Sequence, residues 1–105
     1  TITMTPWPGK NPIESTNEIV KQQIDNGFPI PCLTLEHTKP SFRPYVWHWF
    51  LIAGYEEYGE TLMVKLVTYG TWHWVSLNDL WDTGYKRKGG LILFEENEET
   101  EFEEA

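Results

Sequence analysis

One histidine of this chain stands where its side chain could do chemistry. His48 is the only polar residue in the apolar and aromatic run from Val46 to Ala53 (VWHWFLIA). A continuous run of this kind predicts a β-strand that is buried on both faces. An imidazole in such a strand must be hydrogen-bonded or functional, because an unpaired buried polar group costs about 1 to 3 kcal/mol. From its residue type alone, His48 is either a core histidine whose ring nitrogens are hydrogen-bonded or a catalytic base, and the first is favoured.

The single cysteine, Cys32, lacks the surroundings of a nucleophile. It lies inside a predicted strand, and no helix begins after it whose dipole would stabilise a thiolate. We therefore expect a buried and inert thiol. Together with His37, His48 and His73 it matches no zinc-site spacing, so the sequence predicts no metal site and no other cofactor.

Four tryptophans occupy alternating positions in two predicted strands, at Trp47, Trp49, Trp72 and Trp74. Alternation of this kind is typical of core residues, which is the favoured interpretation. A platform on which a sugar or a peptide stacks is the alternative.

The elements that must position these residues follow from caps, turns and periodicity. Residues 1–10 hold two prolines and a glycine, which predicts an irregular arm packed by Trp7. Asn11 and Pro12 have the residue types of a helix start, and Gly27 is a C-terminal stop. The sequence thus predicts one amphipathic helix near the N-terminus.

The rest of the chain is predicted to be mainly strands. A turn at 56–60 makes a hairpin, Tyr69-Gly70 makes a second turn, and Ser76 caps a short helical turn. Strands are expected at 30–36, 46–55, 61–68, 72–75 and 91–94. One helix followed by about five strands predicts an α+β fold with a mostly antiparallel sheet.

Charge and length indicate a single domain over residues 1–94 with an acidic, disordered tail at 95–105. The net charge is −8, and seven glutamates of the tail account for −7 of it. The body is therefore nearly neutral. The basic run at 86–88 is too short for a nucleic-acid interface. No apolar run reaches the length of about 20 residues that a membrane span needs, so we expect a soluble protein, cytoplasmic or secreted after processing.

Several motifs occur in an order that carries a resemblance. A helix ends near a glycine, residues 27–30 (GFPI) enter a strand, residues 48–55 (HWFLIAGY) form the next, and Tyr69-Gly70 follows a third. In this order the chain resembles the C-terminal half of papain-like cysteine peptidases, particularly the bacterial C39-like group. The resemblance covers about residues 11–94.

The resemblance implies that His48 is the general base of a cysteine hydrolase that acts on a peptide or amide bond. The nucleophilic cysteine would lie upstream of residue 1, on a helix that this chain does not contain. Where the family has an Asn or Asp, this chain has Val67 and Thr68. Thr68 is thus a weak candidate for orienting His48, with Asn78 or Asp79 as alternatives from the next loop. The missing Asn or Asp is consistent both with a catalytic dyad of nucleophile and histidine and with a loss of catalysis.

Two functions of other classes stay open. One is a non-catalytic binding or inhibitory module that retains the fold and holds a partner protein through its aromatic residues or its acidic tail. The other is a small structural domain without a ligand. Half of a fold would expose a large apolar face where the missing helices pack, so we expect either a homodimer or a peptide or protein partner.

Overall fold

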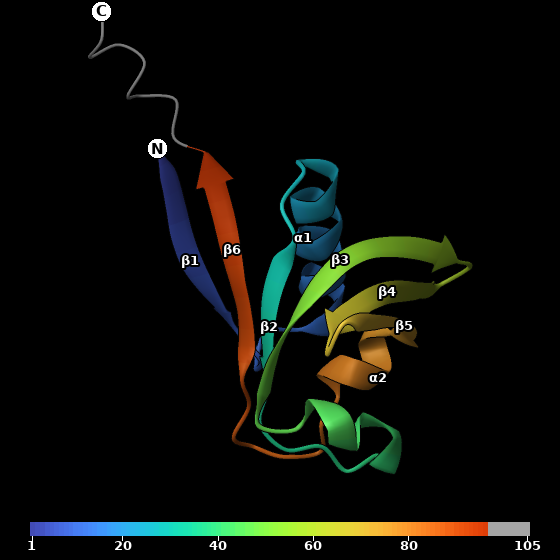
Figure 1. Ribbon diagram of the computed structural model, residues 1–105. Coiled ribbons are helices and arrows are strands. Elements are labelled where there is room, and N and C mark those ends of the chain that lie inside the picture. The colour runs from blue at the N-terminus through green and yellow to red at the C-terminus, as the bar shows by residue number, and fades with distance from the viewer. Residues whose placement is uncertain (97–105) are drawn as a thin grey trace, which may run out of the picture.

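The computed structural model describes residues 1–96, and most of the expected acidic tail, residues 97–105, lies outside the described residues. The described chain is α+β, with one six-stranded sheet and three helical segments (Figure 1). No helix within residues 1–96 is long and apolar enough to cross a membrane. In chain order the elements are β1 (Ile2–Pro8), α1 (Ile13–Asp25), β2 (Ile30–Thr34), the 3-10 helix η1 (Pro40–Tyr45), β3 (His48–Tyr58), β4 (Thr61–Thr68), β5 (Thr71–Ser76), α2 (Leu77–Trp81) and β6 (Gly90–Glu96).

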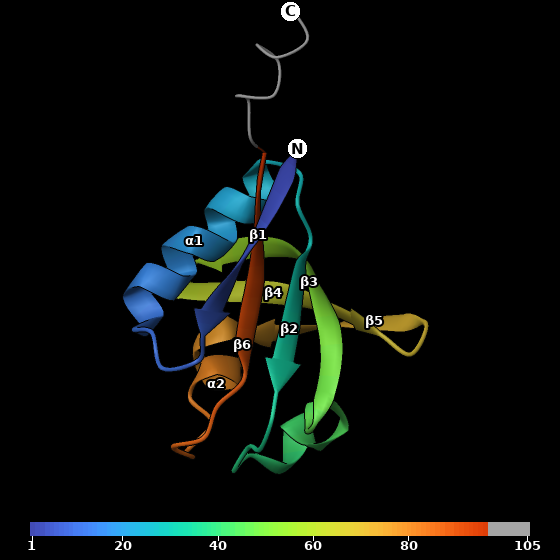
Figure 2. The same ribbon diagram turned by 90° about the vertical axis from the view of Figure 1, so that its left-hand side faces the viewer.

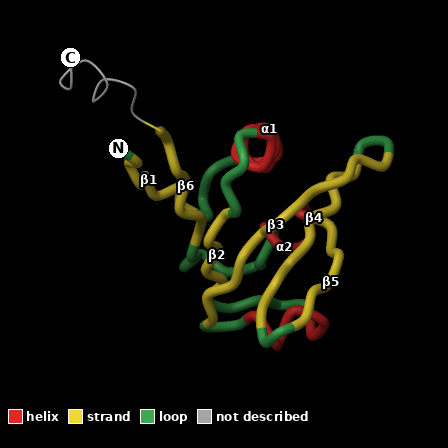
Figure 3. Tube along the Cα trace, turned by 45° about the horizontal axis from the view of Figure 1, so that its top comes forward, coloured by secondary structure: helices red, strands yellow, loops and turns green. Residues whose placement is uncertain are grey.

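The six strands lie in the order β1-β6-β2-β3-β4-β5, and every neighbouring pair is antiparallel. A mostly antiparallel sheet in an α+β fold is therefore confirmed, with six strands in place of about five. The sheet curves strongly, so that β1 and β6 form one arm and β4 and β5 the other (Figure 3). The long strand β3 lies between the two arms and carries a register shift between Ile52 and Gly54. A bulge of this kind bends a strand and increases its twist.

The first residues form a strand and not an irregular arm. β1 pairs with β6 along its whole length, from Ile2 opposite Glu96 to Pro8 opposite Gly90. The prediction that a helix is the first element is therefore wrong. β6 extends to Glu96, two residues into the expected acidic tail. β1 tolerates its two prolines because it is an edge strand and needs hydrogen bonds on one side only.

Both α-helices lie inside the curve of the sheet (Figures 1 and 2). α1 packs against β2 and β3, α2 packs against β4 and β5, and the two helices contact each other. The core therefore fills the concave side of the sheet. Its completely buried members are Val20, Ile30, Ile52, Val64, Leu66 and Leu77.

The sequence signals locate the helix ends, but the cap of α1 differs from the expected one. Pro12 and not Asn11 is the N-cap residue of α1, which has no side-chain cap, and the side-chain amide of Asn11 donates to the carbonyl oxygen of Pro8. After the helix Gly27 takes a φ of +87°, which only glycine adopts without strain. Ser76 caps α2 as predicted, because its Oγ accepts a hydrogen bond from the Asp79 backbone N–H at 3.3 Å.

Candidate functional site

The strand that carries His48 is buried on one face only. Phe50 and Ile52 point into the core, whereas Trp49 and Leu51, on the opposite face, are 52% and 39% exposed. The prediction that both faces are buried is therefore wrong, because no described element covers the convex side of the sheet. We call this side the outer face. It is lined by Trp49, Leu51, Lys65, Val67, Trp72 and Trp74.

His48 is the first residue of β3 and is half-buried on the concave side. The pairing of Leu51 with Val67 brings the start of β3 beside the end of β4. As a result His48 Nε2 lies 2.6 Å from Thr68 Oγ1, which is a short hydrogen bond between two side chains. The structure thus brings together the two residues that the sequence singled out as base and orienting group.

Two residues with a strained backbone conformation lie next to His48 in the chain or against its ring. Trp47 and Tyr69 are the two non-glycine residues with positive φ within residues 1–96, each at +53°. The Tyr69 ring lies flat on the imidazole of His48, with 4.6 Å between centroids and 4° between planes. Such left-handed conformations cost on the order of 1 to 3 kcal/mol and cluster at functional sites. The sequence reasoning missed Tyr69, although an aromatic residue before glycine in a two-residue turn is an unusual choice where Asn-Gly is the norm.

A comparison with His37 shows what is special about His48. Both ring nitrogens of His37 are occupied, since Nε2 bonds the Asp79 carbonyl oxygen at 2.8 Å and Nδ1 accepts from the Lys39 backbone N–H at 3.0 Å. In His48 only Nε2 has a hydrogen-bond partner within the described residues. When Nε2 carries the proton and donates it to Thr68, Nδ1 keeps a lone pair and can accept a proton.

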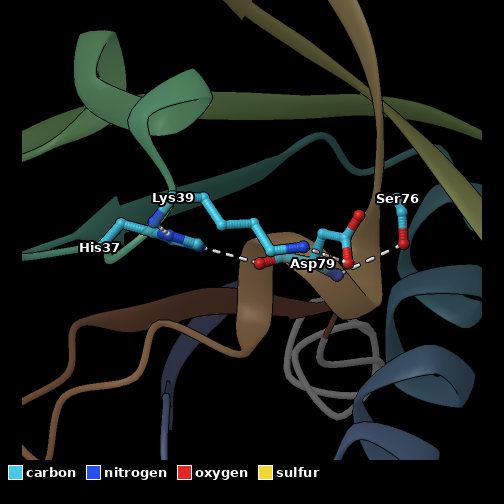
Figure 4. A network of polar contacts seen from close by, with 4 residues as sticks. All are labelled: His37, Lys39, Ser76 and Asp79. Carbon is cyan, nitrogen blue, oxygen red and sulfur yellow. Dashed lines mark hydrogen bonds and ion pairs between the residues drawn. The ribbon is translucent and has the colours of Figure 1, made fainter.

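Asp79, the alternative orienting residue, belongs to a different network (Figure 4). Its carboxylate pairs with the Lys39 ammonium at 2.9 Å, and its backbone bonds Ser76 and His37. The expectation that Asp79 approaches His48 is therefore not met, because its side chain is held on the His37 loop.

Cys32 is a core residue in β2, opposite Phe50 of β3. Burial raises the pKa of its thiol to about 12, and a smaller contribution from Thr34 opposes that shift. A thiol with so high a pKa is almost entirely protonated at neutral pH. The prediction that Cys32 is buried is confirmed. Within residues 1–96, no group of three or more His, Cys, Asp or Glu side chains is placed to hold a metal ion.

The four tryptophans are not core residues. Trp47, Trp49, Trp72 and Trp74 are between 43% and 59% exposed, so the favoured core interpretation is wrong. Cations lie over two of the rings: Lys65 Nζ is 5.2 Å from the Trp72 ring centroid, and Arg87 Cζ is 5.4 Å from that of Trp47. Because Lys65 and Trp72 belong to the outer face, this face combines aromatic rings with a positive charge, which suits a binding surface.

A cavity of about 310 Å³ lies between η1 and β5. Thr68 and Tyr69, the two residues that contact His48, form part of its wall, and His73 of β5 lines it as well. The remaining lining residues are Ser41, Pro44, Tyr45, Thr71, Trp74 and Val75. A group bound in this cavity would therefore touch the residues that hold His48.

Comparisons of the chain with protein-family models, with curated proteins and with solved structures find no match. The functional proposals below therefore rest on the geometry of the chain itself and on its motifs.

Proposed function

We propose that this chain is the histidine-bearing half of a papain-like, C39-like cysteine hydrolase, and that another segment supplies the nucleophilic cysteine. The observation that carries the proposal is the state of His48. Its Nε2 is held by Thr68 Oγ1 at 2.6 Å, while Nδ1 has no hydrogen-bond partner within residues 1–96. A general base needs this arrangement, with one nitrogen fixed and the other available to a proton donor.

In this proposal His48 moves one proton in each direction. Nδ1 takes the proton of the cysteine thiol, and the thiolate attacks the carbonyl carbon of a peptide or amide bond. The imidazolium then protonates the leaving amine, which leaves a thioester on the cysteine. Water, deprotonated by His48, hydrolyses the thioester and releases the acid. The cysteine and His48 are thus restored.

Thr68 orients the imidazole but does not balance its charge. When Nε2 carries the proton, the hydroxyl oxygen of Thr68 accepts this N–H and fixes the orientation of the ring. It carries no negative charge, so it stabilises the imidazolium less than a carboxylate does. The site therefore resembles a nucleophile–histidine dyad, and the stacked ring of Tyr69 restricts the imidazole further.

Cys32 is not the nucleophile in this proposal, because it is buried and its pKa is raised to about 12. The missing thiol is expected on a segment encoded upstream of Thr1. The first test is to read that coding sequence for about 80 residues with a cysteine at a predicted helix start. The absence of such a cysteine would overturn the hydrolase proposal.

The second test is hydrolysis of a mixed peptide library by the protein expressed with its upstream segment. We expect His48→Ala to lower turnover by at least about 100-fold, the usual contribution of a general base. His37→Gln is the matched control, because that histidine is fully hydrogen-bonded within the protein, and it should retain activity. Equal activity of the His48→Ala variant and the wild type would contradict the assigned role.

A non-catalytic binding module is the second candidate, and the outer face supports it. Trp49 of β3 and Trp72 and Trp74 of β5 are exposed on the same face of the sheet, on either side of β4. In such a module the His48→Ala variant would bind its partner unchanged, whereas alanine substitutions in the outer face would abolish binding. Under the hydrolase proposal, His48→Ala would abolish catalysis, whereas alanine substitutions in the outer face would affect it less.

A further inference from the structure

The two edges of the sheet differ in how they are protected. β1 contains two prolines, which lack the N–H that an added strand would need. β5 (TWHWVS) has no proline, no lysine and no carboxylate, and its pairing with β4 runs without a bulge. Natural proteins usually block an exposed edge with one of these devices. β5 is therefore an open edge.

The register shows which backbone groups β5 presents. Thr68 pairs with Thr71 across the two-residue turn, so these two exchange hydrogen bonds. The pairs then alternate along the hairpin, which turns the backbone N–H and C=O of Trp72 and Trp74 away from β4. No other backbone hydrogen bond reaches these groups from the described residues. The same two residues carry their exposed indoles on the outer face.

Both sides of this edge have side-chain features that a partner strand would meet. On the outer face, Lys65 lies over Trp72 and has no carboxylate partner within residues 1–96. On the concave side, the cavity of about 310 Å³ opens beside His73. A residue paired opposite His73 would direct its side chain to that side, because side chains alternate along a strand.

We propose that the edge of β5 binds an extended peptide that adds a seventh strand to the sheet. The peptide carries carboxylates opposite Trp72 and Trp74, within reach of Lys65, and an aliphatic residue opposite His73 that enters the cavity. Main-chain hydrogen bonds to the two tryptophans supply the affinity, and the alternating side chains supply the selectivity. This proposal rests on the edge, the cavity and Lys65, and not on a catalytic role of His48.

Charge favours such a peptide over a second copy of the chain. A second β5 strand would bring two more tryptophans and a histidine to the edge but no carboxylate for Lys65. An acidic strand complements Lys65, which pairs with no carboxylate of residues 1–96, and electrostatic complementarity of this kind selects the partner.

The test uses the full chain and the peptide acetyl-Thr-Glu-Val-Glu-Thr-amide, followed by tryptophan fluorescence and by hydrogen exchange of the Trp72 and Trp74 amides. We expect a dissociation constant of about 1 mM or below and slower exchange at both amides. N-methylation of the two glutamates, whose N–H groups face β5, should weaken binding at least about tenfold. N-methylation of the valine and the last threonine, whose N–H groups face away, should leave binding unchanged.

A charge reversal provides the second arm. Lys65→Glu should weaken binding of the glutamate peptide about fivefold or more and favour the analogue with lysines in place of glutamates. Lys10→Glu, the same change on an exposed residue beyond β1, should bind like the wild type. The proposal is overturned if no binding is seen at 5 mM peptide, or if both N-methylated peptides lose affinity equally. It is also overturned if the Trp72 and Trp74 amides become protected from exchange as the protein concentration rises without peptide, because the edge would then bind a second copy of the chain.

Discussion

The hydrogen bond between His48 and Thr68 can be tested by removing the hydroxyl alone. Thr68→Val keeps the shape and strand preference of the side chain but leaves His48 Nε2 without its 2.6 Å partner. A typical intramolecular hydrogen bond contributes about 1 kcal/mol to the free energy of unfolding. His48 is half-buried, so water replaces part of the lost bond and the larger penalty of a fully buried orphan does not apply.

The assay is urea unfolding followed by tryptophan fluorescence. With an m-value of about 1.3 kcal/mol per M, a loss of about 1 kcal/mol lowers the unfolding midpoint by about 0.8 M. Thr71→Val is the matched control, because Thr71 is the exposed cross-strand partner of Thr68 and has no side-chain hydrogen bond within residues 1–96. The free energy of unfolding of this control should change by less than about 0.5 kcal/mol.

A double-mutant cycle separates the bond from the individual side chains. Thr68→Val combined with His48→Phe should show a coupling energy of about 1 kcal/mol, because the two residues share one contact. If the Thr68→Val midpoint equals that of the Thr71→Val control, or if the coupling is zero, then Thr68 does not hold His48 and the orienting role fails.

Three further changes probe the surroundings of the site. Tyr69→Asn should leave the melting temperature unchanged or raise it, because the relief of about 1 kcal/mol of left-handed strain offsets the lost stacking, yet it should lower the activity of the upstream-extended protein; a clear loss of stability would contradict the strain. Burial raises the pKa of Cys32 to about 12 from an ordinary value of 9.0, so above pH 9 the thiol ionises in the unfolded chain but not in the folded one. The free energy of unfolding therefore keeps this contribution below pH 9 and loses it between pH 9 and 12, by up to about 1.4 kcal/mol per pH unit. Urea unfolding at pH 8, 9 and 10 should therefore show a steeper decline for the wild type than for Cys32→Ala, and parallel curves would refute it. Gln23→Met should cost about 2 to 3 kcal/mol, because the Gln23 amide bonds both the N–H and the C=O of Phe94 at 2.8 Å, whereas the exposed Gln22→Met should be neutral; equal denaturation midpoints would contradict that.

Local signals predicted much of the fold. The strand at 61–68, the turn at Tyr69-Gly70 and the Ser76 cap follow from alternation, turn residues and capping, which act between near neighbours. β1 was missed because its prolines predict irregular structure. Its ordering depends on pairing with β6, more than 80 positions away along the chain, and no local pattern reveals that partner.

The site was predictable only in part. The hairpin register made a contact between His48 and Thr68 foreseeable, since both lie at the same end of adjacent strands. The run around His48 predicted burial on both faces because its residues are apolar on both. Hydrophobicity does not reveal whether a covering layer is present, and the described residues leave Trp49 and Leu51 exposed. The strain at Tyr69 depends on backbone angles that the composition of the turn only hints at.

The most direct test of the role of His48 needs no substrate. The protein is expressed together with the proposed upstream segment, and the rate of alkylation of the proposed nucleophilic cysteine by iodoacetamide is measured at pH 6.5 in the wild type and in His48→Ala. If His48 takes the thiol proton, the wild-type cysteine is largely thiolate at this pH and the variant reacts at least about tenfold more slowly. Equal alkylation rates in the two proteins would contradict the assignment of His48 as the general base.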